Sequence, residues 1–451
     1  MRVTKFKNYY IPSLIIYGQI MSYSKYLSHS VDLFSKPMKE VGFVKGFDHI
    51  IRPQTLLNDS VEFKLDPDDV NYLKTDQTFI YCKFKIVDNE GKDLENTVKV
   101  APINYFPAAL FESCEIFCND IRISGASHNS LPYKRYIETL LSYGLDARNS
   151  HLKLAMFEMD SVNNFDNSDD NLGHKERKTW VQGSKDCEFL YWLQNDILNV
   201  DRYYPSGMKL RFMFHKSASD WCLMEDNLTE AEKTARKAEF KFNIKILDMS
   251  LNIRKVTPEQ SLVTEHRQRF SKNQTALYPY TRGVVKKFTV LQGQTAVYLP
   301  SMLTGKLPTQ VFMVMNETEA DLGSLSKNPF KFQHFNMSRA ALTIDGQLRK
   351  EYNCDFDNNN YIDVLAELYR NIGIHNSNSG TVIDKDYFKN GCAIVSWNLT
   401  PDKSSYMPFT QGTIDIDVTY STALEMGVTI IILCLFDDIL QIDAGRNIII
   451  V

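Results

Sequence analysis

The chain contains 451 residues, of which 43% are hydrophobic and 24% charged, a composition typical of a globular protein with a buried core. Its 27 Phe and 23 Tyr favour strands over long helices and exclude a largely disordered chain. The net charge of −4 gives no indication that the whole chain binds nucleic acid. Because all-β domains often span roughly 200–250 residues, the length fits two such units.

Residues 1–46 form the first distinct region, because they hold seven basic side chains against only Asp32 and Glu40. Their formal charge is therefore +5, and the remainder of the chain carries −9. We predict a basic N-terminal arm that contacts an anionic partner, with a solvated terminus as the alternative interpretation. The basic side chains predicted to face that partner are Arg2, Lys5, Lys7 and Lys25.

Residues 47–260 are predicted to form a β-rich unit that contains one clear hairpin and one helix. Glu115–Ile123 has the pattern of two strands joined by a tight turn at Asn119-Asp120. An amphipathic helix follows, ends at Gly144 as a glycine C-cap, and is expected to pack on the strands. Its apolar positions are Tyr133, Tyr136, Ile137, Leu140 and Leu141.

The rest of this unit alternates polar insertions with strands. Ser161–Arg177 is rich in Asn and Asp and is predicted to be an exposed loop, and Leu228–Lys241 is predicted to be a short helix on a loop. Alternating apolar side chains from Met208 to Phe214 predict a strand with one buried face. A long strand is predicted over Phe242–Val256, and it is expected to end at Thr257-Pro258.

Residues 261–451 repeat the same signatures in the same order. A hairpin turns at Asp345-Gly346, a second amphipathic helix ends at Gly373, and strands are predicted over Ile414–Tyr420 and Val428–Ile442. The apolar positions of this helix are Tyr361, Val364, Leu365, Leu368 and Tyr369. The ordered repetition predicts one β-rich unit built twice in tandem, with a boundary near residues 257–280.

No motif for catalysis or for a cofactor is found along the chain. Gly-rich phosphate loops and nucleophile elbows do not occur, and the nine histidines are too far apart in sequence to predict a metal site on one strand. Asp355–Asn359 imitates the start of a calcium loop, but Asn360 and Ala366 stand where its glycine and glutamate belong. We therefore predict no catalytic, cofactor-binding or metal-binding residues, no cofactor, and no enzymatic activity.

The eight cysteines form no CxxC pair, and we interpret them as reduced residues of the core. The longest apolar run, Val428–Phe436, is about half the length that a bilayer requires, so no membrane span is expected. The N-terminus only faintly resembles a signal peptide, and Met21 could equally be the natural start. The protein is accordingly expected to act inside the cell and not to be secreted.

Several segments, taken together and in order, resemble the major capsid proteins of Polinton/Maverick elements and adintovirus-like viruses. No single motif is diagnostic, and the resemblance covers roughly residues 50–451. The segments that carry it are Leu110–Ser124, Leu131–Gly144, Tyr204–Phe212, Ser219–Met224, Gly305–Pro308, Asn328–Phe332, Asn398–Asp402 and Gly412–Ile416.

This resemblance implies an all-β double jelly-roll, with two tandem eight-stranded sandwiches and short inserted helices, over residues 47–260 and 261–451. It implies a structural protein whose homotrimers form pseudo-hexagonal capsomers, which tile an icosahedral shell around double-stranded DNA. The implied partners are neighbouring capsomers, a minor (penton) capsid protein and genomic DNA through the arm. The implied location is the virion capsid, assembled in the nucleus or cytoplasm of a host cell.

A second interpretation keeps the β-sandwich but changes its role. The chain would then be a carbohydrate-binding or carbohydrate-active protein, which predicts an aromatic-lined groove with convergent carboxylates and a monomer in solution.

Overall fold

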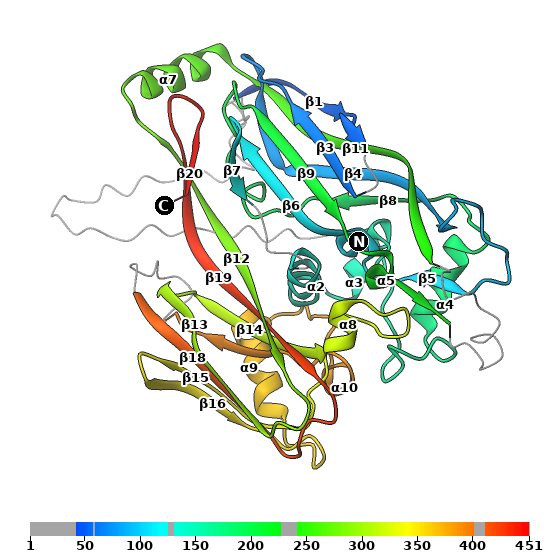
Figure 1. The fold of residues 1–451 in the computed structure, drawn as a ribbon. Helices are drawn as coiled ribbons and strands as arrows, with labels where there is room; N and C mark the ends of the chain where they lie inside the picture. The colour runs from blue at the N-terminus through cyan, green and yellow to red at the C-terminus, as the bar shows by residue number, and fades with distance from the viewer. Residues whose placement is uncertain (1–41, 57–58, 125–129, 227–240, 401–410, 451) are drawn as a thin grey trace, which may run out of the picture. The chain divides into compact units, whose positions relative to one another are not determined.

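The computed structural model describes residues 42–56, 59–124, 130–226, 241–400 and 411–450 (Figure 1). Residues Gly42–Val451 form one compact unit. The predicted arm residues Arg2, Lys5, Lys7 and Lys25 lie outside the described residues, as does most of the helix predicted over Leu228–Lys241. The first described strand begins at Phe43, inside the range predicted as the arm.

The first half of the unit contains two sheets that face each other and one small ribbon. One sheet has the strand order β1-β11-β4-β8, the other has the order β2-β3-β9-β6-β7, and β10 pairs with β5. The strands are β1 (Phe43–Ile51), β2 (Thr55–Leu56), β3 (Ser60–Leu65), β4 (Tyr72–Asp88), β5 (Val100–Pro102), β6 (Phe111–Cys118), β7 (Ile121–Ser124), β8 (Cys187–Trp192), β9 (Leu210–Lys216), β10 (Leu223–Glu225) and β11 (Phe242–Pro258).

The second half contains two sheets with the orders β12-β19-β14-β17 and β13-β18-β15-β16, and β20 pairs with β19. Its longest ladder joins β12 to β19 from Ala276↔Ile442 to Val290↔Val428. The strands are β12 (Ala276–Val290), β13 (Ala296–Lys306), β14 (Gln310–Glu317), β15 (Met337–Ile344), β16 (Gln347–Asn353), β17 (Val395–Asn398), β18 (Gln411–Tyr420), β19 (Val428–Ile442) and β20 (Ile448–Ile450).

The two halves have the same topology. The strands β1, β3, β4, β6, β7, β8, β9 and β11 correspond in chain order to β12 through β19. Counted in this order, each half has one sheet with the sequence 1-8-3-6 and one with the sequence 2-7-4-5. This is the jelly-roll arrangement, and the predicted double jelly-roll is therefore confirmed.

Helices lie between the strands, and two of them occupy equivalent places. The helix α2 follows the β6–β7 hairpin, and α9 follows the β15–β16 hairpin (Figure 1). The helices are α1 (Phe106–Ala109), α2 (Leu131–Ser142), α3 (Leu145–Arg148), the 3₁₀ helix η1 (His151–Ala155), α4 (Leu172–Val181), α5 (Ser219–Cys222), α7 (Gln260–Ser271), α8 (Thr318–Leu322), α9 (Ile362–Ile372) and α10 (Lys385–Lys389).

The predicted hairpin turns are confirmed by the backbone. Asn119 and Asp120 have φ of 49° and 64°, and Asp345 and Gly346 have φ of 50° and 74°. Two central residues with positive φ are what a tight two-residue hairpin requires, and Asn, Asp and Gly accept this conformation at low cost. The predicted ends of the long strands are also close to those of β11 and β19.

Two local predictions are wrong, and one helix was missed. Gly144 is not a left-handed C-cap: Tyr143 caps α2, and Gly144 has an extended φ of −96° at the start of α3. Ser161–Arg177 is not simply an exposed loop, because α4 begins within it and several of its polar side chains are buried. The charged stretch Thr264–Asn273 lies largely within α7, a helix that was not predicted.

Candidate functional site: the seam between the two jelly-rolls

The helix α2 lies where the two jelly-rolls meet. Leu131-Pro132 starts the helix, and Tyr133, Ile137 and Leu140 are each fully buried within it. The ring of Tyr136 stacks on Phe330 of the second jelly-roll, with ring centroids 4.0 Å apart. A helix that belongs to the first jelly-roll therefore also forms part of the core that joins it to the second, and we call this junction the seam.

The hydroxyl of Tyr133 links α2 to the second jelly-roll through buried polar groups. It donates to Oδ1 of Asp321 at 2.9 Å and accepts from the side-chain amide of Asn316 at 2.9 Å. Asp321 also accepts from Lys287 Nζ at 2.8 Å, and its carbonyl accepts from the Trp221 indole at 3.1 Å. Burial, and then the negative charge of Asp321, raise the pKa of Tyr133, so this hydroxyl stays protonated and keeps donating.

A second polar contact joins the charged side of α2 to β12. Lys134 forms an ion pair with both oxygens of Asp196, and Oδ2 of Asp196 also accepts from the backbone N–H of Gly283 at 2.8 Å. A Cβ at position 283 would lie 2.5 Å from Cε of Lys134. A side chain at position 283 would therefore displace the end of the lysine side chain, which passes directly over the strand.

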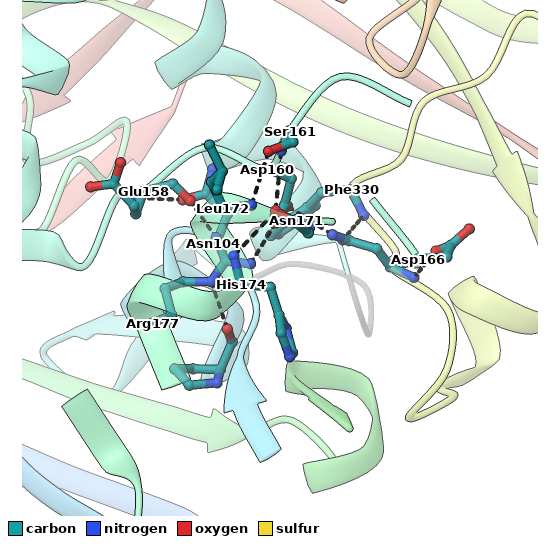
Figure 2. Close-up of polar contacts among 12 residues, drawn as sticks. Asn104, Glu158, Asp160, Ser161, Asp166, Asn171, Leu172, His174, Arg177 and Phe330 are labelled. Carbon is teal, nitrogen blue, oxygen red and sulfur yellow. Dashed lines mark hydrogen bonds and ion pairs between the residues drawn. The ribbon is translucent and has the colours of Figure 1, made fainter. Parts of the chain in front are cut away.

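The largest polar cluster of the seam is centred on Arg177 of α4, which is completely buried (Figure 2). Its guanidinium donates to the carbonyls of Pro102 and Glu158 and forms an ion pair with Asp160, whose side chain is also fully buried. Because a buried charge is tolerated only when it is paired and hydrogen-bonded, these contacts are needed for the fold of this region.

Asp160 connects this polar cluster to the second jelly-roll. Its Oδ2 accepts from the side-chain amide of Asn328 at 2.8 Å, and its Oδ1 accepts from Asn171 at 2.8 Å. Asp166 strengthens the junction by accepting from the backbone N–H of Asn328 at 2.8 Å and from Lys331 Nζ at 2.7 Å. Figure 2 shows Asp160, Asp166 and Asn171 of the first jelly-roll beside Phe330 of the second.

Glycines allow the close approach that the cluster needs. A Cβ at Gly173 would lie 2.1 Å from the carbonyl oxygen of Met159, so no other residue fits at this turn of α4. On the opposite side, Gly391 has a φ of 151°, and a Cβ there would overlap the ring of Phe165, which packs on Tyr387. Phe165 belongs to the first jelly-roll and Tyr387 to the second, so this apolar contact also crosses the seam.

Seven of the eight cysteines are buried, and Cys187 is half-buried. Each of the eight cysteines is a free thiol, and burial raises the pKa of Cys114 and of Cys434 to about 12, so these thiols are not nucleophiles near neutral pH. In the part of the chain that the structure describes, no three His, Cys, Asp or Glu side chains come together as ligands for a metal ion.

The second helix singled out by the sequence packs within the second jelly-roll. Leu365 and Leu368 are buried in α9, which packs against β17 of its own jelly-roll. Tyr361 occupies the N-cap position of α9, and its ring stacks between Phe356 and Phe388.

The seam residues Asp160, Arg177, Asn328 and Asp321 were not identified from the sequence. One signal for this region was available, because Asn171 has the residue type of an N-cap. Its side chain accepts from the backbone N–H of His174 and caps the start of α4. Within the described ranges, none of the helices combines the length and the apolar character needed to cross a bilayer.

Comparison with known proteins shows which proteins share this fold. No family model matches the chain. The uncharacterized protein F54H12.2 of Caenorhabditis elegans is 22% identical over 405 residues, which cover 86% of this chain and 92% of that protein.

Among solved structures, the Sputnik virophage structure matches with a TM-score of 0.58 at 10% identity, covering 96% of this chain and 93% of that chain. The mavirus major capsid protein matches with a TM-score of 0.54 at 9% identity, covering 98% and 96%. The Faustovirus major capsid protein matches with a TM-score of 0.53 at 10% identity, covering 90% and 92%. The chain thus has, over nearly its whole length, the double jelly-roll fold of these viral major capsid proteins.

Proposed function

We propose that the chain is a major capsid protein, and that three copies form a pseudo-hexagonal capsomer that tiles an icosahedral shell around double-stranded DNA. The observation that carries this proposal is the pairing of two jelly-rolls of identical topology in one chain. Three such chains present six similar walls, and a body with six similar walls can fill a plane with equivalent contacts. The coverage of the solved capsid proteins from end to end supports the same conclusion.

The seam fits this role. A capsomer keeps its outline only if the two jelly-rolls of each subunit do not move relative to each other. A fully buried ion pair between Arg177 and Asp160, extended to Asn328 of the second jelly-roll, resists such movement because sliding would leave charges unpaired in the interior. The seam therefore holds the two jelly-rolls in one fixed arrangement.

Light scattering coupled to size-exclusion chromatography tests the proposal. We expect a particle of about three times the 52.0 kDa chain, and hexagonal outlines in negative-stain images of the same fraction. A monomer at every concentration, with binding to a glycan array, would contradict the capsid role and favour the carbohydrate-binding alternative.

We also propose that the basic arm, residues 1–46, lies at the inner capsid surface and contacts genomic DNA or a minor (penton) capsid protein. This part of the proposal rests on charge, because the arm carries +5 and the remainder of the chain −9. Lysine and arginine side chains that neutralise phosphates release counterions, so the affinity for DNA should fall steeply with salt. Assembly would take place inside a host cell, and neighbouring capsomers would be the remaining partners.

The DNA contact is tested in the full chain by replacing Arg2, Lys5, Lys7 and Lys25 with Gln. A matched control removes four exposed basic charges of the body, at Lys185, Lys272, Arg349 and Lys385. We expect only the arm variant to lose affinity for duplex DNA, with a salt dependence shallower by about 3–4 in the log–log slope. Equal losses in both variants, or loss of the trimer in the arm variant, would contradict this placement of the arm.

A further inference from the structure

A cavity of about 570 Å³ lies beneath α7, the helix that connects the two jelly-rolls. Its apolar wall includes Tyr203, Leu262, Phe270 and Tyr278, and Phe43 and Leu277 stand at its mouth with 37% and 44% of their surface exposed. A volume of this size falls within the range of roughly 300–1,000 Å³ that protein sites for specific ligands occupy. Exposed aromatic and branched side chains around such a cavity indicate a binding surface.

The wall of the cavity is held in place by polar contacts. The hydroxyl of Tyr72 lies 3.0 Å from Nδ1 of His266, and the Tyr278 hydroxyl donates to the carbonyl of Tyr203 at 2.9 Å. Val263 of α7 is buried against Tyr72, which anchors the helix over the cavity. The cavity is thus already formed in the free chain.

The surroundings of the cavity carry a surplus of positive charge. Arg202 and Arg269 line it together with Asp201, and Arg269 is neutralised by Glu265 at 2.6 Å. The guanidinium of Arg446 lies over the ring of Phe270 at 4.2 Å, and its Nη1 is buried without a hydrogen-bond partner among the described residues. The pKa of Arg446 is lowered by burial and further by the nearby charge of Arg267.

Within the described ranges, no ion pair is formed by the three arginines at positions 202, 267 and 446, although the charge of Asp443 acts on Arg446. They bond instead to main-chain carbonyls, those of Leu277, Asp69 and Ser206 in that order. Guanidinium groups held in this way keep donors available for a carboxylate brought by a ligand.

The cavity also lies between two sheet edges. In the described sheets, β1 and β12 are both terminal strands, and their residues Phe43 and Leu277 stand at the mouth. Edge strands offer main-chain groups to an added strand, which favours an extended peptide as the ligand.

We propose that this cavity binds an acidic, extended peptide segment of another protein, with one aromatic or branched side chain in the cavity and carboxylates on Arg202 and Arg267. The apolar anchor would supply the buried area, and the carboxylates would fix the register of the peptide. This surface is distinct from the seam, and its use does not depend on capsomer assembly.

The test uses the full chain and a fluorescein-labelled nonapeptide with a central phenylalanine flanked by aspartate and glutamate. Fluorescence anisotropy should show saturable binding that weakens with salt, and a peptide with lysine in place of each acidic residue should not bind. Leu277→Asp, and separately the pair Arg202→Gln and Arg267→Gln, should each weaken binding by about tenfold or more. Two changes on β16, Leu348→Asp and Arg349→Gln, replace an exposed leucine and an exposed arginine elsewhere and should leave binding unchanged.

Equal binding of the acidic and the basic peptide, or equal binding to all variants, would overturn the proposal. If Leu277→Asp instead changes the particle mass in light scattering while the peptide does not bind, the occupant is a second copy of this chain and the proposal is also wrong. The mass of the wild-type particle is measured in the same experiment, so a failure of peptide binding is distinguishable from a failure to form trimers.

Discussion

Helices α2 and α9 follow the same hairpin in the two jelly-rolls and share the same spacing of apolar side chains, but they contact different neighbours. The helix α9 packs within its own jelly-roll, where Tyr361 stacks on Phe356 and Phe388. The helix α2 contacts β6 of its own jelly-roll and also β12 and Phe330 of the other. The two equivalent helices thus stabilise a domain interior in one half and a junction between domains in the other.

The difference lies in the polar groups around each helix. Lys134 and Arg135 of α2 are almost completely buried and are balanced by Asp196 and Glu138, whereas Arg370 of α9 extends into solvent. Apolar contacts alone would allow the two jelly-rolls to slide, because they are not directional. The buried ion pairs and hydrogen bonds at the seam can form in only one arrangement of the two jelly-rolls. The comparison of α2 with α9 leads to four predictions.

The largest effect is expected where the seam buries charge. Asp160→Ala leaves the guanidinium of Arg177 buried without its carboxylate, and we expect a loss of about 3–5 kcal/mol in the free energy of unfolding, measured with urea. Asp66→Ala is the control, because Asp66 pairs with Lys64 at 3.8 Å with 77% of its side chain exposed and should cost less than about 1 kcal/mol. Equal losses in the two variants would show that the buried pair does not hold the seam.

Truncation of the two helices should separate their roles. Leu140 and Leu368 are both fully buried, and replacing either with Ala should cost about 2–5 kcal/mol in the free energy of unfolding. Hydrogen exchange gives the comparison, because only Leu140→Ala should increase exchange in Asn328–Phe332, the segment of the second jelly-roll that packs on α2. If Leu368→Ala increases exchange there to the same extent, the proposed division between seam and interior is wrong.

A smaller effect is expected from single hydroxyl groups. Tyr133→Phe removes the partner of Asp321 and Asn316 in a buried site, and should cost about 1–3 kcal/mol by thermal or urea unfolding. Tyr361→Phe is the matched change on α9, and it should be nearly neutral, because within the described residues its hydroxyl has no hydrogen-bond partner. A neutral Tyr133→Phe would mean that the hydroxyl contributes no net stability to the seam.

The last prediction concerns pH and lies on the α9 side. Burial, and then the charge of Lys389, lower the pKa of His334 to about 4, and its ring stacks on Phe356. Since the unfolded chain binds this proton near pH 6.5, the stability due to His334 is present above pH 6.5 and is lost as the pH falls toward 4. His334→Gln should make the urea midpoint less dependent on pH over this interval. His375→Gln, which changes an exposed histidine, should leave that dependence as it is in the wild type.

The sequence predicted the parts of the fold that depend on local patterns. The turns at Asn119-Asp120 and Asp345-Gly346 follow from residue types that accept positive φ, and β19 follows from an uninterrupted apolar run. The double jelly-roll was predicted because these local signals recur in the same order and because their segments resemble a known family.

The seam was not predictable in the same way. Asp160 lies 17 residues from Arg177 and 168 residues from Asn328, and no periodicity connects such positions. A segment rich in Asn and Asp has the composition of an exposed loop, and only the arrival of distant partners shows that its carboxylates are buried. The end of α2 was misplaced for a related reason, because Gly144 was judged by its type, whereas a Cβ there would meet the carbonyl oxygen of Gly380 at 2.8 Å.

The ladder between β12 and β19 has a consequence for how the protein is made. The strand that opens the second jelly-roll pairs along its whole length with Val428–Ile442, far along the chain. The first jelly-roll closes in a similar way, because β1 pairs with β11, but β11 leaves the ribosome before most of the second jelly-roll has been translated. The first jelly-roll can therefore complete its sheets during synthesis, whereas β12 lacks its partner strand until Val428–Ile442 has been made. During this interval, newly made chains are most exposed to wrong pairing with one another.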